Sequence, residues 1–207
     1  YSRWRLCPCP DCDENSKTLE VGAFASAMDA KTKRCRSCRG EGKTLQLVNV
    51  LRDAAADLRA GRCYWPVALL QPHGLTPVTL ATLAAPGAAP PSPTEAAALL
   101  RVGAELAGLI IRAAESAWPY VQAIAVDAVR LRLACAWPLL LALETLAALN
   151  RAGSPILVPG RPVKVTRGQV YALLARSIYA ALRDRQDGGR RLDQLFAGAL
   201  AAAQAPR

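Results

Sequence analysis

Apolar residues recur at helical spacing over most of the chain, and this pattern predicts a mainly helical protein. Between residues 45 and 60, apolar positions that include Leu47, Leu51 and Leu58 repeat with a helical period, and charged residues lie on the opposite side. Gly61 follows as a typical helix end. We therefore expect one helix here, packed on the segment that precedes it.

Two capping boxes predict where later helices begin. Ser92-Pro93-Thr94-Glu95 combines an N-cap serine, a proline in the first turn and a glutamate three residues after the cap, so we expect a helix from there to about Ser116. Thr166-Arg167-Gly168-Gln169 predicts a second start of this kind. That helix should end at Gly188-Gly189, before a last helix.

Prolines predict the boundaries between these helices. Trp118-Pro119 and Trp137-Pro138 should each end one helix and open the next, because proline is tolerated in the first turn of a helix but not in its interior. Residues 71–92 contain five prolines and two glycines, which favours a linker or a long surface loop with at most a short helix from Pro77 to Leu83.

A short β-hairpin is expected near residue 160. Ile156 to Val158 and Val163 to Val165 are β-prone runs on either side of Pro159-Gly160-Arg161-Pro162. No apolar run reaches the roughly 18 to 20 residues needed to cross a bilayer, because charged residues interrupt residues 120–149. We therefore expect no transmembrane segment.

The chain is strongly basic. It contains 26 lysines and arginines against 16 acidic residues, which gives a net charge of +10. This balance favours polyanionic partners such as nucleic acid or an anionic membrane surface, although a GC-rich coding sequence also raises the arginine content. The numbering begins at Tyr1 rather than at a methionine, so we expect the chain to be a piece of a longer protein.

Four of the seven cysteines form two C-x2-C pairs, Cys9 with Cys12 and Cys35 with Cys38, and Lys-Thr-Leu follows each pair at the same offset. Structural zinc prefers four thiolates, and a two-residue spacer lets both sulfurs of a turn face one ion. We predict a structural zinc bound by these four residues, with Cys7 as the alternative ligand. Thiols kept reduced for metal predict a reducing intracellular compartment, cytoplasmic or nuclear.

The segment Cys35-Arg36-Ser37-Cys38-Arg39-Gly40-Glu41-Gly42 resembles the C-x2-C-x-G-x-G zinc repeat of DnaJ-type chaperones. A similar pair with similar spacing occurs in lambda-type phage late-gene antiterminators. The resemblance covers residues 9–42 only, and the first half departs from it because Glu14 and Ser16 stand where the second half has glycines. The chaperone resemblance implies contacts with proteins, and the antiterminator resemblance implies contacts with DNA and RNA polymerase.

Basic residues surround the second cysteine pair, and phosphates are their natural counter-charge. A solvated basic loop is the alternative interpretation. The predicted nucleic-acid contacts are Lys31, Lys33, Arg34, Arg36, Arg39 and Lys43, with Arg161, Lys164 and Arg167 as a secondary set.

Catalysis is not expected from the sequence. His73 is the only histidine and lies in a proline-flanked segment, and the acidic residues are few and dispersed, with no paired-carboxylate motif that stands out. Four thiolates would also saturate zinc and leave no position for an activating water.

The prediction is therefore a mainly α protein with a small N-terminal four-cysteine zinc-knuckle or ribbon module, packed on a helical bundle with one short β-hairpin. Its expected parts are a zinc-binding module (1–45), a helix packing on it (46–70), a linker or loop (71–92) and a helical domain (93–207). We expect a non-enzymatic, zinc-stabilised basic protein that binds DNA or RNA or regulates transcription. The alternative is an assembly or adaptor protein whose zinc module braces a helical domain for a protein partner or a second copy.

Overall fold

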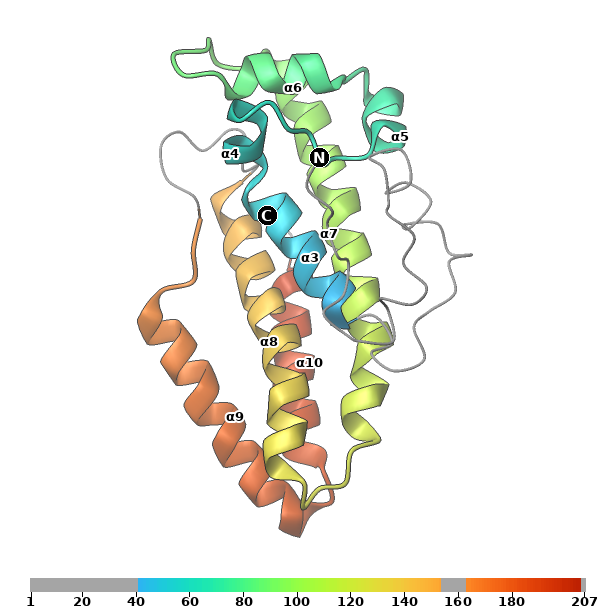
Figure 1. The fold of residues 1–207 in the computed structure, drawn as a ribbon, viewed down its shortest axis with the longest axis vertical. Helices are drawn as coiled ribbons and strands as arrows, with labels where there is room; N and C mark the ends of the chain where they lie inside the picture. Colours follow the sequence, from blue (N-terminus) through green and yellow to red (C-terminus); the bar gives the residue numbers. More distant parts are fainter. Residues whose placement is uncertain (1–40, 154–162, 206–207) are drawn as a thin grey trace.

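The computed structural model describes residues 41–153 and 163–205, and helices dominate this part of the chain. Figure 1 shows long helices running side by side, with shorter helices grouped at one end. The mainly helical prediction is confirmed for these residues. The helices are α3 (Glu41–Arg52), α4 (Ala54–Arg59), α5 (Val67–Leu70), η1 (Gln71–His73), α6 (Pro77–Ala84), α7 (Pro93–Gln122), α8 (Val129–Ala152), α9 (Arg167–Asp187) and α10 (Arg190–Gln204).

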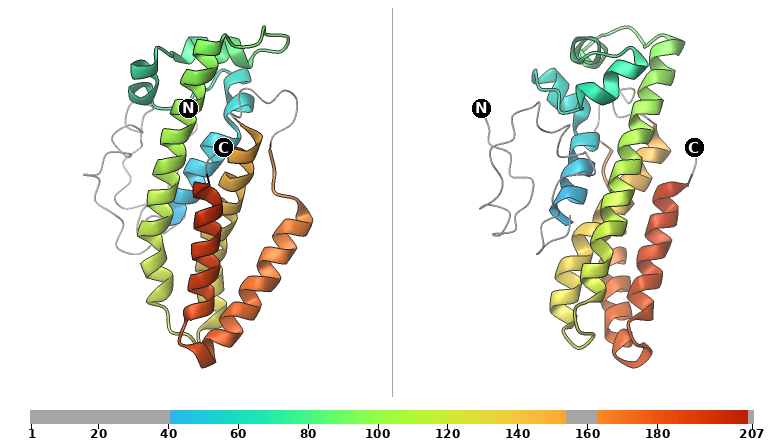
Figure 2. Two further views of the ribbon diagram at one scale, coloured as in Figure 1. Left: turned by 180° about the vertical axis from the view of Figure 1, so that it is seen from behind. Right: turned by 90° about the vertical axis from the view of Figure 1, so that its right-hand side faces the viewer.

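Helices α7, α8 and α10 form the body of the bundle, and α3 packs across α7 and α8 (Figures 1 and 2). The short helices α4, α5 and α6 lie beyond one end of α3 (Figure 1). Helix α9 packs on the outside, against α8 and α10, and its first turns diverge from the bundle (Figure 1).

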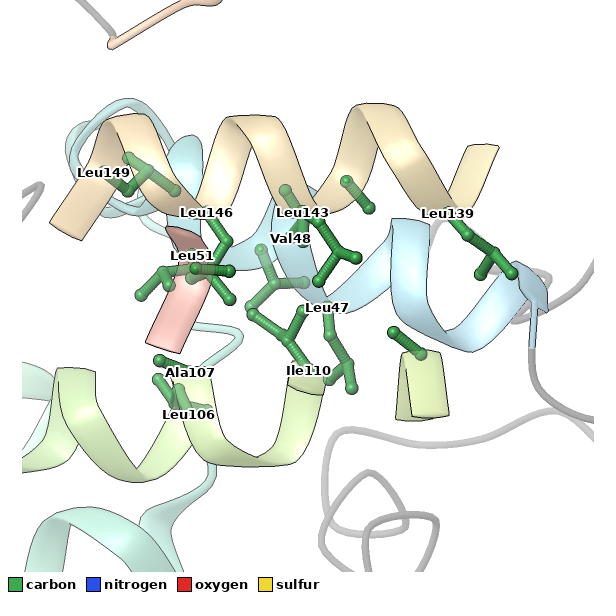
Figure 3. Close-up of a cluster of buried hydrophobic side chains, with 14 of the residues drawn as sticks. Leu47, Val48, Leu51, Leu106, Ala107, Ile110, Leu139, Leu143, Leu146 and Leu149 are labelled. Carbon is green, nitrogen blue, oxygen red and sulfur yellow. The ribbon is translucent and has the colours of Figure 1, made fainter. Parts of the chain in front are cut away.

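The core lies where α3, α7 and α8 meet, as Figure 3 shows. Burial of each large aliphatic side chain stabilises the fold by roughly 1.5–3 kcal/mol, and an amphipathic helix gains this only from its apolar face. The apolar stripe of α3 therefore sets how the helix is rotated. The labelled core residues are Leu47, Val48 and Leu51 from α3, Leu106, Ala107 and Ile110 from α7, and Leu139, Leu143, Leu146 and Leu149 from α8.

Both capping boxes are confirmed. The Ser92 hydroxyl accepts a hydrogen bond from the Glu95 N–H, and the Glu95 carboxylate accepts one from the Ser92 N–H. Thr166 and Gln169 form the same reciprocal pair at the start of α9. Gly188 ends α9 in the left-handed region, at φ 66°, which confirms the predicted break before α10.

Two predicted boundaries are wrong, because Pro119 and Pro138 lie inside α7 and α8. An interior proline costs about 3 kcal/mol, which burial of two or three leucines offsets. Leu139, Leu140 and Leu143, within five residues after Pro138, are fully buried. Helix α8 therefore runs through Pro138, because a continuous helix buries these leucines.

The predicted β-hairpin is not formed as expected. Val163 to Val165 adopts no strand, and no strand occurs elsewhere in the described residues. Ile156 to Val158 lies outside them. The helix predicted from residue 45 to 60 is interrupted at Asp53, between α3 and α4, and the expected short helix after Pro77 is present as α6. The domain boundaries at residues 45, 70 and 92 stay a prediction.

Helix α8 is long and apolar enough to cross a membrane by length and composition. Half of its most apolar window is buried inside the structure, so its apolar character is also accounted for by its place at the centre of the bundle. The helix by itself is weak evidence for a membrane span.

A buried ion pair fixes the α9–α10 turn to α8. Arg132 Nη1 lies 3.2 Å from Asp184 Oδ2, and both side chains are buried. Asp184 also accepts hydrogen bonds from the backbone N–H groups of Arg191 and Leu192, at the first turn of α10. One carboxylate therefore caps α10 and neutralises the guanidinium of α8.

We expect Asp184→Ala to lower the free energy of unfolding by about 3–5 kcal/mol, because it leaves the Arg132 charge buried without its partner. Chemical denaturation of the two proteins measures the difference. Asp187→Ala is the matched control, because Asp187 pairs with Arg191 on the exposed surface, where such a pair contributes about 0.5 kcal/mol or less. Equal effects of the two substitutions would contradict the structural role of the buried pair.

Candidate functional site

Three oxygen-bearing side chains share one helical line where α3 passes into α4. Asn49, Asp53 and Asp57 are spaced four residues apart. The Asp53 N–H donates to the Asn49 carbonyl at 2.9 Å, and the Asp57 N–H donates to the Asp53 carbonyl at 2.9 Å. These bonds continue the helical turns across the interruption at Asp53, so the three side chains follow one another along one face.

The opposite face of this segment is apolar and buried. Leu47, Leu51, Ala54 and Leu58 are each no more than 5% exposed. Their burial directs the oxygen-bearing line away from the core: 38% of the Asp53 side chain and 20% of the Asp57 side chain are exposed. The two carboxylates are thus partly shielded and still reachable by a ligand.

Each carboxylate is held by an arginine. Arg52 binds Asp53 with two nitrogens, Nε to Oδ1 at 2.8 Å and Nη2 to Oδ2 at 2.6 Å. This hydrogen bond raises the pKa of Arg52 above its ordinary value. Arg62 Nη2 lies 3.1 Å from Asp57 Oδ1, and the Arg62 N–H donates to the Asp57 carbonyl at 2.8 Å. We call Asn49, Asp53, Asp57, Arg52 and Arg62 the aspartate cluster.

The aspartate cluster offers the oxygen ligands that a hard divalent cation prefers. Mg²⁺ prefers oxygen ligands and is usually held by one or two carboxylates together with water and substrate phosphates. In residues 41–153 and 163–205, no three histidine, cysteine or acidic side chains converge. The arginines match phosphate oxygens, which a guanidinium binds with two parallel hydrogen bonds.

Cys63 and Trp65 follow the aspartate cluster along the chain. The Cys63 thiol lies 3.8 Å from the Trp65 carbonyl oxygen, and burial raises the pKa of Cys63. Trp65 is 3% exposed, and its Nε1 has no hydrogen-bond partner among the described residues. Neither cysteine of the described part, Cys63 or Cys135, is in a disulfide.

We expect iodoacetamide to alkylate Cys63 more slowly in the folded protein than in urea at pH 8. Only the thiolate reacts. Because the pKa of Cys63 is raised, the thiol stays protonated until the pH exceeds the ordinary pKa range of cysteine. Mass spectrometry of the peptide that contains Cys63 measures the rate. A rate that is the same folded and unfolded, or that levels off below pH 8, would contradict this prediction.

A separate open hollow of about 490 Å³ lies between η1 and the first turns of α7. His73 and Arg101 contribute to its wall, and His73 Nε2 lies 2.7 Å from Glu105 Oε1. The fold thus gives His73 an acidic partner that is distant in sequence. No member of the aspartate cluster lines this hollow.

Most residues predicted as ligands or contacts lie outside the described residues. Two exceptions are Lys164, exposed in the segment before α9, and Arg167, exposed at the first residue of α9. Lys43 lies in α3, but the placement of its side chain is not described. The predicted residues outside the described part are Cys7, Cys9, Cys12, Cys35, Cys38, Lys31, Lys33, Arg34, Arg36, Arg39 and Arg161.

The sequence interpretation missed the aspartate cluster. It treated Asp53 and Asp57 as the solvated side of an amphipathic helix and found no paired-carboxylate motif. The detectable signal is Asn49-x3-Asp53-x3-Asp57, three hard oxygen donors at the helical repeat, with Arg52 and Arg62 beside the two aspartates. One aspartate pair at this spacing is common on helices, whereas the third donor in line is more specific.

Comparison with known families shows a match over much of the chain. Residues 22–169 match the model of the family described as squalene/phytoene synthase, which is more than half of the chain and includes the whole aspartate cluster. No curated protein matches the chain.

This match corrects the predicted identity and function. The resemblance to DnaJ-type repeats and phage antiterminators is wrong, because the family match extends through the second cysteine pair and far beyond it. The nucleic-acid-binding regulator and the adaptor protein are both overturned, as is the expectation of a non-enzyme, because members of the matched family are isoprenoid synthases.

The predicted zinc cofactor and nucleic-acid partner are corrected on the same ground. Enzymes of the matched family use Mg²⁺ with diphosphate substrates rather than structural zinc. Basic residues bind the phosphates of a diphosphate as well as those of nucleic acid, so net charge alone could not separate the two classes of partner.

Proposed function

The chain belongs to the squalene/phytoene synthase family, and we propose that its aspartate cluster binds the diphosphate group of an isoprenoid substrate through Mg²⁺. The observation that supports this most is the line of Asn49, Asp53 and Asp57 at successive helical turns with an arginine on each carboxylate. A reducing intracellular compartment remains part of the proposal and is supported by the free thiols of Cys63 and Cys135.

Each residue of the aspartate cluster has a distinct role in this proposal. Asp53 and Asp57 supply carboxylate oxygens, and Asn49 supplies an amide oxygen. Bound Mg²⁺ neutralises charge that develops on a departing diphosphate. Arg52 and Arg62 would bind phosphate oxygens and so hold the diphosphate in one orientation.

The ion pairs of the cluster explain how it tolerates two aspartates in a partly buried position. Two carboxylates and two guanidinium groups leave the local charge near zero without a ligand. Asp53 and Asp57 would hold Mg²⁺, and Arg52 and Arg62 would hold the diphosphate. Each charged side chain would then exchange one charged partner for another, and no charge would be left unpaired.

The first test is calorimetric titration of the full chain with inorganic pyrophosphate in the presence of Mg²⁺. We expect Asp53→Asn and Asp57→Asn each to weaken binding by about tenfold or more, because an amide carries no charge to hold the metal. Asp187→Asn is the matched control and should bind as the parent protein does. Unchanged binding in both cluster variants would overturn the proposal.

The arginines are tested separately. We expect Arg62→Gln to weaken pyrophosphate binding by about tenfold, which is the value of a charged hydrogen bond. Arg59→Gln is its control, because Arg59 is exposed on α4 and makes no ion pair within the described part of the chain. An equal loss in both variants would indicate only a general effect of positive charge.

The activity test follows release of inorganic diphosphate from isoprenoid diphosphates of increasing chain length. We expect release that requires Mg²⁺ and is lost in the Asp53→Asn and Asp57→Asn variants. Release that persists after chelation of divalent cations would contradict the assigned role of the cluster.

A further inference from the structure

Helix α9 has apolar residues on two faces, and within the described part of the chain only one of these faces is covered. Its inner face, with Leu173, Ala180 and Ala181, is buried against the bundle. A surface helix normally carries polar residues on the other side. Here the outer side instead carries large exposed apolar residues: Tyr171 (67% exposed), Ile178 (39%), Tyr179 (56%) and Leu182 (52%).

These outer residues form a continuous stripe rather than scattered positions. At about 100° per residue, Tyr171, Ala175, Ile178 and Leu182 lie within roughly 60° of one another, and Tyr179 lies at the edge. Tyr171, Ala175, Ile178 and Leu182 follow one another at intervals of four, three and four residues and so extend over about three helical turns. We call Tyr171, Ala175, Ile178, Tyr179 and Leu182 the outer stripe.

Arginines border the outer stripe on both sides. At the same angular spacing, Arg167 and Arg185 fall along one edge, and Arg176 and Arg183 fall along the other. Arg183 reaches back to the stripe, because its guanidinium lies 5.7 Å from the centre of the Tyr179 ring. All four arginines are exposed.

The acidic residues of α9 do not offset this positive charge at the surface. Asp184 is buried in its ion pair with Arg132, and Asp187 is paired with Arg191. The outer side of α9 is therefore apolar along its middle and cationic along both edges.

We propose that α9 docks the protein on the surface of an anionic lipid bilayer. An interfacial helix buries an apolar stripe at the boundary of headgroups and acyl chains, with cationic side chains beside it that reach the phosphates. The bordering arginines favour this occupant over an uncharged apolar surface, because anionic lipids supply their counter-charge. The inference rests on the faces of α9 and not on the proposed reaction.

Co-sedimentation of the full chain with vesicles tests the proposal. We expect binding to vesicles that contain phosphatidylglycerol, little binding to phosphatidylcholine alone, and weaker binding as salt rises. Tyr171→Ser, Ile178→Ser and Leu182→Ser together should lower the partition coefficient by more than about tenfold. These side chains are exposed, so thermal unfolding should change little, and circular dichroism checks that the variant is folded.

Val78→Ser is the matched control, because Val78 is 75% exposed on α6, away from α9. Arg176→Gln with Arg185→Gln should reduce the preference for anionic vesicles, whereas Arg59→Gln should not. Binding that ignores lipid charge, or that the triple variant retains, would overturn the proposal.

Two further measurements separate the alternatives. Sedimentation of the protein alone that shows a dimer lost in the triple variant would assign the outer stripe to a second copy and overturn the membrane proposal. Asp53→Asn should bind vesicles as the parent does while losing pyrophosphate, so failure of membrane docking and failure of the proposed function give different results.

Discussion

The packing of α3 against α7 and α8 determines where the proposed functional groups lie. Leu47, Val48 and Leu51 must face the core, and no other rotation of α3 buries them together. At 100° per residue, Asn49 and Asp53 lie on the side of the helix away from Leu47 and Leu51, so the same rotation places them on the outer side. The site is thus a consequence of core packing, which acts over many side chains and is far stronger than any interaction within the cluster.

The interruption at Asp53 adds a second constraint. The 49–53 and 53–57 hydrogen bonds hold the three oxygen donors in line although the helix is broken between α3 and α4. Arg52 and Arg62 then limit the freedom of the two carboxylates. A metal ion and a diphosphate would have to replace both ion pairs, so the pairs balance charge in the free protein rather than hold the side chains in their ligand-bound positions.

Sequence patterns predicted the features that depend on neighbouring residues and failed where distant contacts decide. The capping boxes at Ser92 and Thr166 are local and were predictable. The passage of α8 through Pro138 depends on leucines buried by other helices, and the pairing of His73 with Glu105 joins residues 32 apart. The aspartate cluster can be identified in the sequence only with its third oxygen donor, Asn49. Asp53 and Asp57 alone fit a solvated helix face equally well.

Helices α8 and α9 show why overall hydrophobicity does not identify the surface that meets a membrane. Helix α8 is long and apolar enough to span one, yet half of its most apolar window is already covered by neighbouring helices. Helix α9 carries fewer apolar residues, but those of its outer stripe are uncovered and bordered by arginines. Lipid contact depends on the apolar area that the fold leaves exposed and on the charge beside it, and both quantities are larger on the outer side of α9.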